Sequence, residues 1–395
     1  MKSKRIFCTL IILVFLNGCM GGRELNELAI AISMGIDKAE DGYLLTFQIL
    51  NPKAIASRRA QNEAPIILYT ETGKDLFEIK RRITEQSPRK IYNSHLRTVV
   101  FGEDMAKEGI QQTLDFFVRG HEYRTGFFFL VAKGTTANHI LKELTPLEVV
   151  PGIEIYNSLK TSEESWAPTK TVKLYKLVND LISDGKDPVL TGIKLFDPKN
   201  PIHSIEILKQ SDPTKLMVSN LAVFRDDKLA GWLNEDESKG YNYIMGNVKN
   251  TVGEVKYDDQ GQVTFEAIKT KVKRKATLLN NKPAINVEIM VKANVVAQTG
   301  ELDLTSEEII EKISRKAEGD IEDVCNAALE ITRKDFKTDV FGFGEEIHKK
   351  YPKLWKQVKN NWNDEFARLP INVKAHVQIN GLGESTKSVF SKGNE

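Results

Sequence analysis

The N-terminal leader is the feature that most constrains how this chain folds. Residues 1–5 carry three basic side chains and no acid, and residues 6–16 form an uncharged run of eleven. Eleven helical residues span about 16 Å, well short of a hydrocarbon core of about 30 Å, so this pattern is typical of a secretion signal and not of a membrane span. We therefore expect residues 1–18 to be removed and the rest of the chain to fold outside the cytoplasm.

A cysteine follows the leader directly. The string Leu16-Asn17-Gly18-Cys19 resembles the lipobox of bacterial lipoproteins, which has a leucine at minus three, a small residue at minus one and then cysteine. The resemblance implies a diacylglyceryl group on the Cys19 thiol, cleavage before Cys19 and a lipidated tether over residues 19–24. Two acyl chains anchor a protein stably without a membrane span. An ordinary signal peptide that happens to contain a cysteine is the alternative, but no Ala-x-Ala-like cleavage site competes.

Cysteine usage and charge narrow the remaining possibilities. Cys8 leaves with the leader and Cys19 is expected to carry lipid, so Cys325 is the one free thiol and no intramolecular disulfide can form. The chain is 41% apolar, with 56 basic against 54 acidic residues. This balance argues against extensive disorder and against a nucleic-acid partner, which usually requires a concentrated positive excess. Folding must rest on hydrophobic cores of ordinary size.

Residues 25–145 are expected to form an N-terminal α/β domain. Apolar runs at 28–36 and 43–50, separated by a turn, predict a hairpin. Helical spacing of apolar residues follows from Leu76 and again from Ile110, and residues 126–132 read as a buried strand. The order β-β-α-β-α-β predicts a mixed sheet with helices on one face.

Residues 146–212 are expected to form a small middle domain and linker. Pro146 and Pro151 are predicted to break the chain, and the spacing at 174–181 predicts an amphipathic helix. The stretch 196–213 contains three prolines and is the clearest candidate for a linker.

Residues 213–385 are expected to form a C-terminal α/β domain, followed by a polar tail at 386–395. Two hairpins, an alternating strand at 285–295, a helical stretch at 344–368 and a closing strand at 369–379 are predicted. Thr305 and Glu308 fit a capping box before a long helix. The predicted fold class is α+β: three domains of mixed α/β construction, with mixed and antiparallel sheets packed against helices.

A search for catalytic chemistry finds no convincing site. The six histidines lack metal-ligand spacing, and no nucleophile elbow, phosphate loop or dinucleotide fingerprint occurs. His121-Glu122 reads as a surface turn, Glu235-Asp236-Glu237 as a solvated turn, and Cys325 as a buried, inert thiol on the apolar face of the long helix. We predict no catalytic residue, no cofactor and no metal site.

Four lysines at alternate positions of residues 269–275 form the most distinctive charge pattern. If this segment is a β-strand, strand geometry places all four on one face of it. A sheet edge protected by lysines is the favoured interpretation, and a surface facing an anionic leaflet is the alternative. They are Lys269, Lys271, Lys273 and Lys275.

Several motifs resemble one family along the whole mature chain: the Ger(x)C spore germination lipoproteins, the C subunits of nutrient germinant receptors. The likeness rests on residues 23–29, residues 35–38, residues 229–233 with 237–241, and the string Asp339-Val340-Phe341-Gly342-Phe343-Gly344 with Tyr351-Pro352, Trp355, Trp362 and Phe366. The chief departure is Met20-Gly21-Gly22, where many members have Trp-Asp after the cysteine. No residue here corresponds to that Trp-Asp pair.

The resemblance implies a non-catalytic subunit lipid-anchored at Cys19 to the outer face of the spore inner membrane. It also implies assembly with integral-membrane A and B subunits; whether the subunit itself contacts germinant stays open. Trp355 and Trp362 could contact partners, although tryptophan at helical spacing is more often core. Two rival classes are a solute-binding lipoprotein that delivers a nutrient to a membrane transporter or receptor, and an envelope hydrolase.

Overall fold

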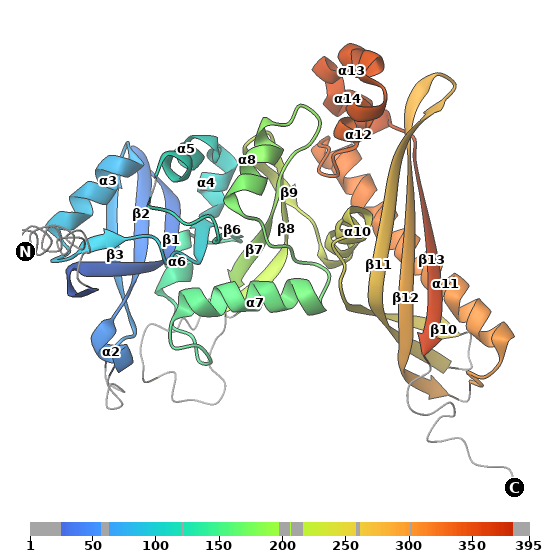
Figure 1. Ribbon diagram of the computed structural model, residues 1–395, viewed down its shortest axis with the longest axis horizontal. Coiled ribbons are helices and arrows are strands. Elements are labelled where there is room, and N and C mark those ends of the chain that lie inside the picture. Colours follow the sequence, from blue (N-terminus) through green and yellow to red (C-terminus); the bar gives the residue numbers. More distant parts are fainter. Residues whose placement is uncertain are drawn as a thin grey trace, which may run out of the picture.

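The computed structural model contains two β-sheets, each packed against helices (Figure 1). The first sheet lies toward the N-terminal end of the longest axis and the second toward the other end. The predicted α+β class with mixed sheets packed against helices is confirmed. The structure describes residues 25–56, 63–120, 122–196, 206, 216–257, 261–300 and 302–381.

The first sheet has nine strands within the described residues. Its order is β3-β2-β1-β5-β6-β7-β8-β9, with β4 paired to β1. The predicted hairpin at 28–36 and 43–50 is present as the antiparallel pair β1 and β2. The bounds are β1 Leu28–Ala39, β2 Gly42–Leu50, β3 Ile66–Gly73, β4 Lys90–Tyr92, β5 Thr98–Phe101, β6 Phe128–Ala132, β7 Val189–Leu195, β8 Leu216–Arg225 and β9 Lys228–Trp232.

Helices cover both faces of this sheet, so the prediction of helices on one face is wrong (Figure 1). Phe129 and Val131 pack in the core beneath α3, α5 and α8, whereas Phe128 and Leu130 pack beneath α6 and α7. Successive strand residues point to opposite faces, so a continuous apolar run requires cover on both. The helices are η1 Leu25–Glu27, α2 Pro52–Ala56, α3 Leu76–Arg82, η2 Ile83–Glu85, α4 Glu103–Glu108, α5 Gln111–Arg119, α6 Ala137–Lys142, α7 Pro151–Ser165 and α8 Leu174–Ile182.

Strands from all three expected domains share the first sheet. β7, from the expected middle domain, pairs in parallel with β6 and antiparallel with β8, which comes from the expected C-terminal domain. The sheet therefore continues across the predicted boundaries at 145/146 and 212/213. Most of the expected linker at 196–213 lies outside the described residues. Pro151 does not break the chain: it is the first residue of α7, where a missing N–H costs no helical hydrogen bond.

The second sheet has the order β10-β11-β12-β13, and β13 runs parallel to β12. The long helix α11 packs on one face through Ile313, Ala317, Ile321 and Cys325. The bounds are α10 Glu235–Met245, β10 Thr251–Tyr257, β11 Gly261–Leu279, β12 Lys282–Gly300, α11 Glu307–Ile331, the π-helical turn η3 Thr332–Phe336, α12 Phe343–Lys350, α13 Pro352–Val358, η4 Lys359–Asn361, α14 Trp362–Arg368 and β13 Ile371–Gly381.

Two local predictions in this half are wrong. The acidic run at 235–237 is the first turn of α10. Asn234 and Glu237 form a capping box there, and the negative charges interact favourably with the positive end of the helix dipole. The expected capping box of Thr305 is absent: the N-cap of α11 is Ser306, and the Thr305 hydroxyl donates to Asp303 at 2.5 Å. The predicted helical stretch at 344–368 is confirmed as the consecutive helices α12, α13 and α14, and Pro352 begins the second of them.

Candidate membrane-proximal site

The predicted lipid-attachment residue, Cys19, lies outside the described residues. The described chain begins with η1 and enters β1 at Leu28, nine residues after Cys19. Nine residues span at most about 30 Å when fully extended. A lipid on Cys19 would therefore keep the start of β1, and whatever surrounds it, within that distance of the bilayer.

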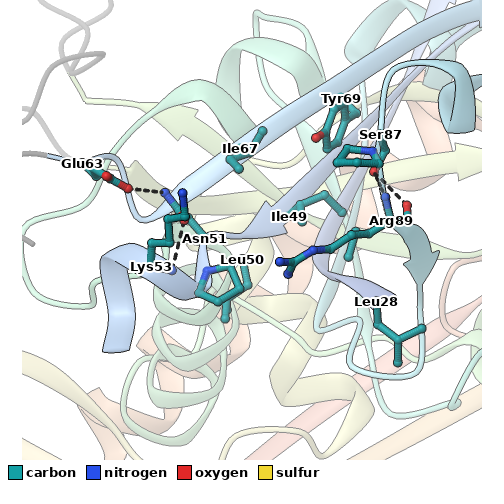
Figure 2. Close-up of a pocket in the computed structure, with 13 residues that line it drawn as sticks. Leu28, Ile49, Leu50, Asn51, Lys53, Glu63, Ile67, Tyr69, Ser87 and Arg89 are labelled. Carbon is teal, nitrogen blue, oxygen red and sulfur yellow. Dashed lines mark hydrogen bonds between the residues drawn. The ribbon is translucent and has the colours of Figure 1, made fainter. Parts of the chain in front are cut away.

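A groove of about 330 Å³ opens beside the start of β1 (Figure 2). Its apolar lining includes Leu28 and Ala29 from β1, Ile49 and Leu50 from β2, and Ile67 from β3. Leu28, Ala29 and Ile49 are buried, whereas the Ile67 side chain is 41% exposed. The groove thus has a buried apolar floor that continues onto exposed apolar surface.

The groove lies where β1 changes its pairing partner. β1 pairs with β2 from Ala31 onward, with an irregularity between Ala31 and Ser33, whereas residues 28–30 pair with β4. The segment Ser87-Pro88-Arg89, which leads from η2 into β4, forms another wall of the groove. Four separate stretches of chain therefore converge on this one site.

Asn51 organises one side of the rim. Its Nδ2 donates to the Ala64 carbonyl at 2.9 Å and lies 3.5 Å from Glu63 Oε2, and its Oδ1 accepts from the Lys53 backbone N–H at 3.2 Å (Figure 2). These bonds hold the start of α2 against the residues that precede β3. Lys53 itself is exposed.

Arg89 forms the opposite side of the rim. The Ser87 hydroxyl bonds to both the N–H and the carbonyl of Arg89, at 3.3 Å and 2.8 Å, which fixes the backbone that carries this side chain. Figure 2 shows the guanidinium reaching across the groove toward Leu50. Within the described part of the chain, the charged groups of Arg89 and Lys53 form no ion pair or hydrogen bond. The site therefore combines an apolar floor with two unpaired cations.

The four predicted lysines lie far from this groove, at the other end of the long axis (Figure 1). All four are exposed on one face of β11, as predicted. Beyond Ala267 this strand pairs with β12 alone, so the segment is a sheet edge, which agrees with the favoured interpretation. Lys292 lies directly opposite Lys269, and Glu288 is the one acidic residue opposite the four lysines.

The other residues considered for chemistry serve as core or lie outside the described residues. Cys325 is fully buried, and burial raises the pKa of its thiol, as expected for an inert cysteine. Trp355 and Trp362 are buried, which confirms that they are core residues. His121 and His203 lie outside the described residues. Among the residues that are described, no group of three or more possible metal ligands comes together.

Asp339 is a buried polar centre that no catalytic motif of the sequence indicates. Its buried carboxylate accepts hydrogen bonds from the backbone N–H groups of Phe341, Gly342 and Gly344 at 3.1, 2.9 and 2.8 Å, and from Trp362 Nε1 at 3.1 Å. Burial raises the pKa of Asp339 to about 7, against the effect of these donors. With every donor coming from the chain itself, Asp339 shapes the loop before α12 and is not open to a substrate. The sequence signal for this centre is an aspartate shortly before the glycine-rich string Phe341-Gly342-Phe343-Gly344, whose backbone N–H groups it can accept from.

Two domain families match most of the chain. Residues 21–195 match the spore germination protein N-terminal domain, and residues 219–383 match the spore germination B3/GerAC-like C-terminal domain. The chain is 30% identical to spore germination protein KC of Bacillus subtilis (strain 168), over 97% of each chain. It is 24% identical to spore germination protein A3 of the same organism, over 96% of this chain and 98% of that one.

The fold is also found in a solved structure. The crystal structure of the GerBC protein superposes with a TM-score of 0.53 at 19% identity, covering 87% of this chain and 96% of that one. A two-sheet α/β chain whose halves match these domains is a spore germination protein. It belongs to the GerAC-like family of germinant-receptor C subunits. Every helix in the described ranges is too short or too polar to span a membrane.

Proposed function

We propose that this chain is the lipid-anchored, non-catalytic C subunit of a nutrient germinant receptor. In this proposal it sits on the outer face of the spore inner membrane, assembles with integral-membrane A and B subunits, and is required for germination in response to nutrients. The observation that carries the proposal is the match to spore germination protein KC, which covers 97% of both chains.

Anchoring at Cys19 is supported by the lipobox and by the short distance along the chain to the folded body. Only five residues separate Cys19 from Leu25, where the described structure begins. A tether this short confines the body to a thin layer beside its membrane partners. The resulting rise in effective concentration lets modest contacts hold a complex.

The anchor is tested by Cys19→Ala in a strain that lacks its other nutrient receptors. We expect nutrient germination, followed as the fall in optical density of the spore suspension, to be strongly impaired while sporulation yield is unchanged. Cys325→Ala is the matched control: it removes the other cysteine of the mature chain without touching the anchor and should germinate normally. Normal nutrient germination of the Cys19→Ala strain would refute the anchoring part of the proposal.

The non-catalytic part of the proposal has its own test. It is supported by the inaccessible Cys325 thiol and by the Asp339 carboxylate, whose hydrogen bonds all come from the chain itself. A screen of ester, peptide and glycoside substrates with the purified body should show no turnover. Turnover that survives repurification would revive the hydrolase alternative.

The strand order weakens the solute-binding alternative. Solute-binding lipoproteins normally have two lobes of mainly parallel sheet, whereas here β1 to β3 and β7 to β9 pair antiparallel. Calorimetry of the body with amino acids and sugars should give no saturable heat. A saturable micromolar response would favour that alternative.

A further inference from the structure

We propose that the groove beside β1 binds an acidic phospholipid of the bilayer in which Cys19 is anchored. The proposal deepens the proposed function and rests on it in one respect: the lipid on Cys19 is what holds the groove at the membrane. It assigns a ligand class to residues that the family match leaves without a role.

Position supports a membrane ligand. Leu28 lines the groove and lies nine residues after Cys19, so the groove stays within about 30 Å of the acyl chains in every orientation of the body. Two exposed apolar side chains belong to the segments that form the groove: Ile67, in its lining, is 41% exposed, and Ile55, on the same helix α2 as Lys53, is 45% exposed. Apolar surface next to a lipid anchor is the kind of surface that enters the interfacial region of a bilayer.

The charges fit a phosphate headgroup. Arg89 extends over the groove and Lys53 lies on the facing rim, and neither cation is neutralised by the described residues (Figure 2). A guanidinium can bind a phosphodiester through two parallel hydrogen bonds, and an ammonium adds a second positive charge. Glu63 is the one acid among the residues that line the groove, so the two cations leave the rim with a net positive charge.

The apolar floor favours a lipid over a soluble anion. Leu28, Leu50 and Ile67 offer surface for the glycerol and the first methylene groups of an acyl chain, from which inorganic phosphate would gain nothing. A volume of about 330 Å³ admits a headgroup with the start of its chains, while the rest remains in the leaflet. The two cations would therefore bind the phosphate of the headgroup while the apolar floor contacts the start of the acyl chains.

Flotation with lipid vesicles tests the proposal. The mature chain carrying Cys19→Ala is used, so that binding depends on the folded body alone. We expect it to float with phosphatidylcholine vesicles that contain phosphatidylglycerol and not with phosphatidylcholine alone. The double variant Lys53→Gln/Arg89→Gln should weaken binding at least tenfold, because each cation near an anionic surface contributes about fivefold.

A matched control removes the same charge elsewhere. Lys271 and Lys273 lie on the exposed face of β11, at the far end of the molecule. The double variant Lys271→Gln/Lys273→Gln should bind the vesicles as the parent protein does. Equal weakening in both double variants, or weakening in the β11 variant alone, would overturn the groove as the lipid site. Absence of any preference for phosphatidylglycerol would do the same.

Further arms separate the remaining explanations. Glycerol phosphate at millimolar concentration should not release the protein from the vesicles. Release would indicate that the groove binds a soluble anion and not a lipid. If the double variant melts at a lower temperature than its parent, Ile67→Asn replaces it: this leaves charge unchanged at an exposed position and should still reduce binding. Lipidation of Cys19 is measured separately, by mass spectrometry of the wild-type protein. Failure of the anchoring proposal and failure of the groove proposal therefore appear in different experiments.

Discussion

The backbone N–H of Asp187 donates a hydrogen bond of 2.8 Å to the carbonyl oxygen of Asp339. This bond joins the segment before β7 in the first sheet to the loop before α12, which packs on the second. The Thr338 hydroxyl adds a bond to the Asp187 carboxylate. Because Val189 and Leu221 of the first sheet share one hydrophobic core with the second, the junction is a structural part of the fold and not a loose hinge.

Replacing Asp339 with asparagine should destabilise this junction. An amide has one acceptor oxygen where the carboxylate has two, so its NH₂ group would face the N–H donors of Gly344 or Trp362. Leaving such buried donors unpaired costs about 3 kcal/mol in the free energy of unfolding. Urea denaturation of Asp339→Asn against Asp335→Asn, a nearby exposed aspartate, measures the effect. Equal stability of the two variants would show that the hydrogen bonds contribute little.

Lys170 predicts a specific pH dependence. Its side chain is buried and donates to the Tyr241 hydroxyl at 2.9 Å, and burial lowers its pKa from 10.5 to about 8. Between these two values the unfolded chain binds the proton more tightly, so the free energy of unfolding should rise with pH, by up to about 3 kcal/mol. Lys170→Met should lose this rise, as measured by urea denaturation at pH 7 and pH 10. Parallel pH profiles for the two proteins would contradict the prediction.

Two glutamates of α11 protect the free edge of the second sheet. Glu322 and Glu318 accept hydrogen bonds from the backbone N–H groups of Ala375 and Val377 on β13, each at 3.0 Å. An unprotected strand edge is a template for pairing with another chain. Glu318→Ala/Glu322→Ala should therefore self-associate more readily in sedimentation velocity, whereas Glu318→Gln/Glu322→Gln keeps the acceptor oxygens and should resemble the parent. Identical sedimentation of all three proteins would exclude this role.

The lysines of the second sheet repel one another. Lys269 and Lys292 are directly opposite on β11 and β12, and like charges in this position are destabilising. Lys292→Glu should raise the free energy of unfolding by about 0.5 kcal/mol, and the gain should shrink at high salt. Lys282→Glu, opposite Leu279, is the control and should give no comparable gain. A gain that is independent of salt would point to another cause.

Local pattern predicted most strands and helices, but not their partners. The run at 126–132 corresponds to β6 and the alternation at 285–295 to β12. A strand buried on both faces is a continuous apolar run, and a strand buried on one face alternates apolar and polar residues, so both are visible in the sequence. β3 was missed: most of its residues are half-exposed, and its position is set by pairing with β2. The joining of β7 to β8 was also missed, since long-range pairing leaves no periodic signal.

The candidate site shows the same division. Cys19 rests on a contiguous string, the lipobox, and as a lipid-attachment site it stays a prediction because it lies outside the described residues. The groove could not, because Leu28, Ile49, Ile67 and Arg89 come from four segments that only the fold brings together. The one local signal is Ser87-Pro88, because a proline disfavours helix at the residue before it, and this signal does not indicate a binding site.

Mass spectrometry of the tagged protein, isolated from detergent-solubilised spore inner membranes, examines the lipid anchor and the receptor assembly in one preparation. We expect an N-terminal peptide that begins at diacylglyceryl-modified Cys19, recovered together with the two integral-membrane subunits of a germinant receptor. An unmodified mature N-terminus, or a protein recovered without those subunits, would contradict this expectation.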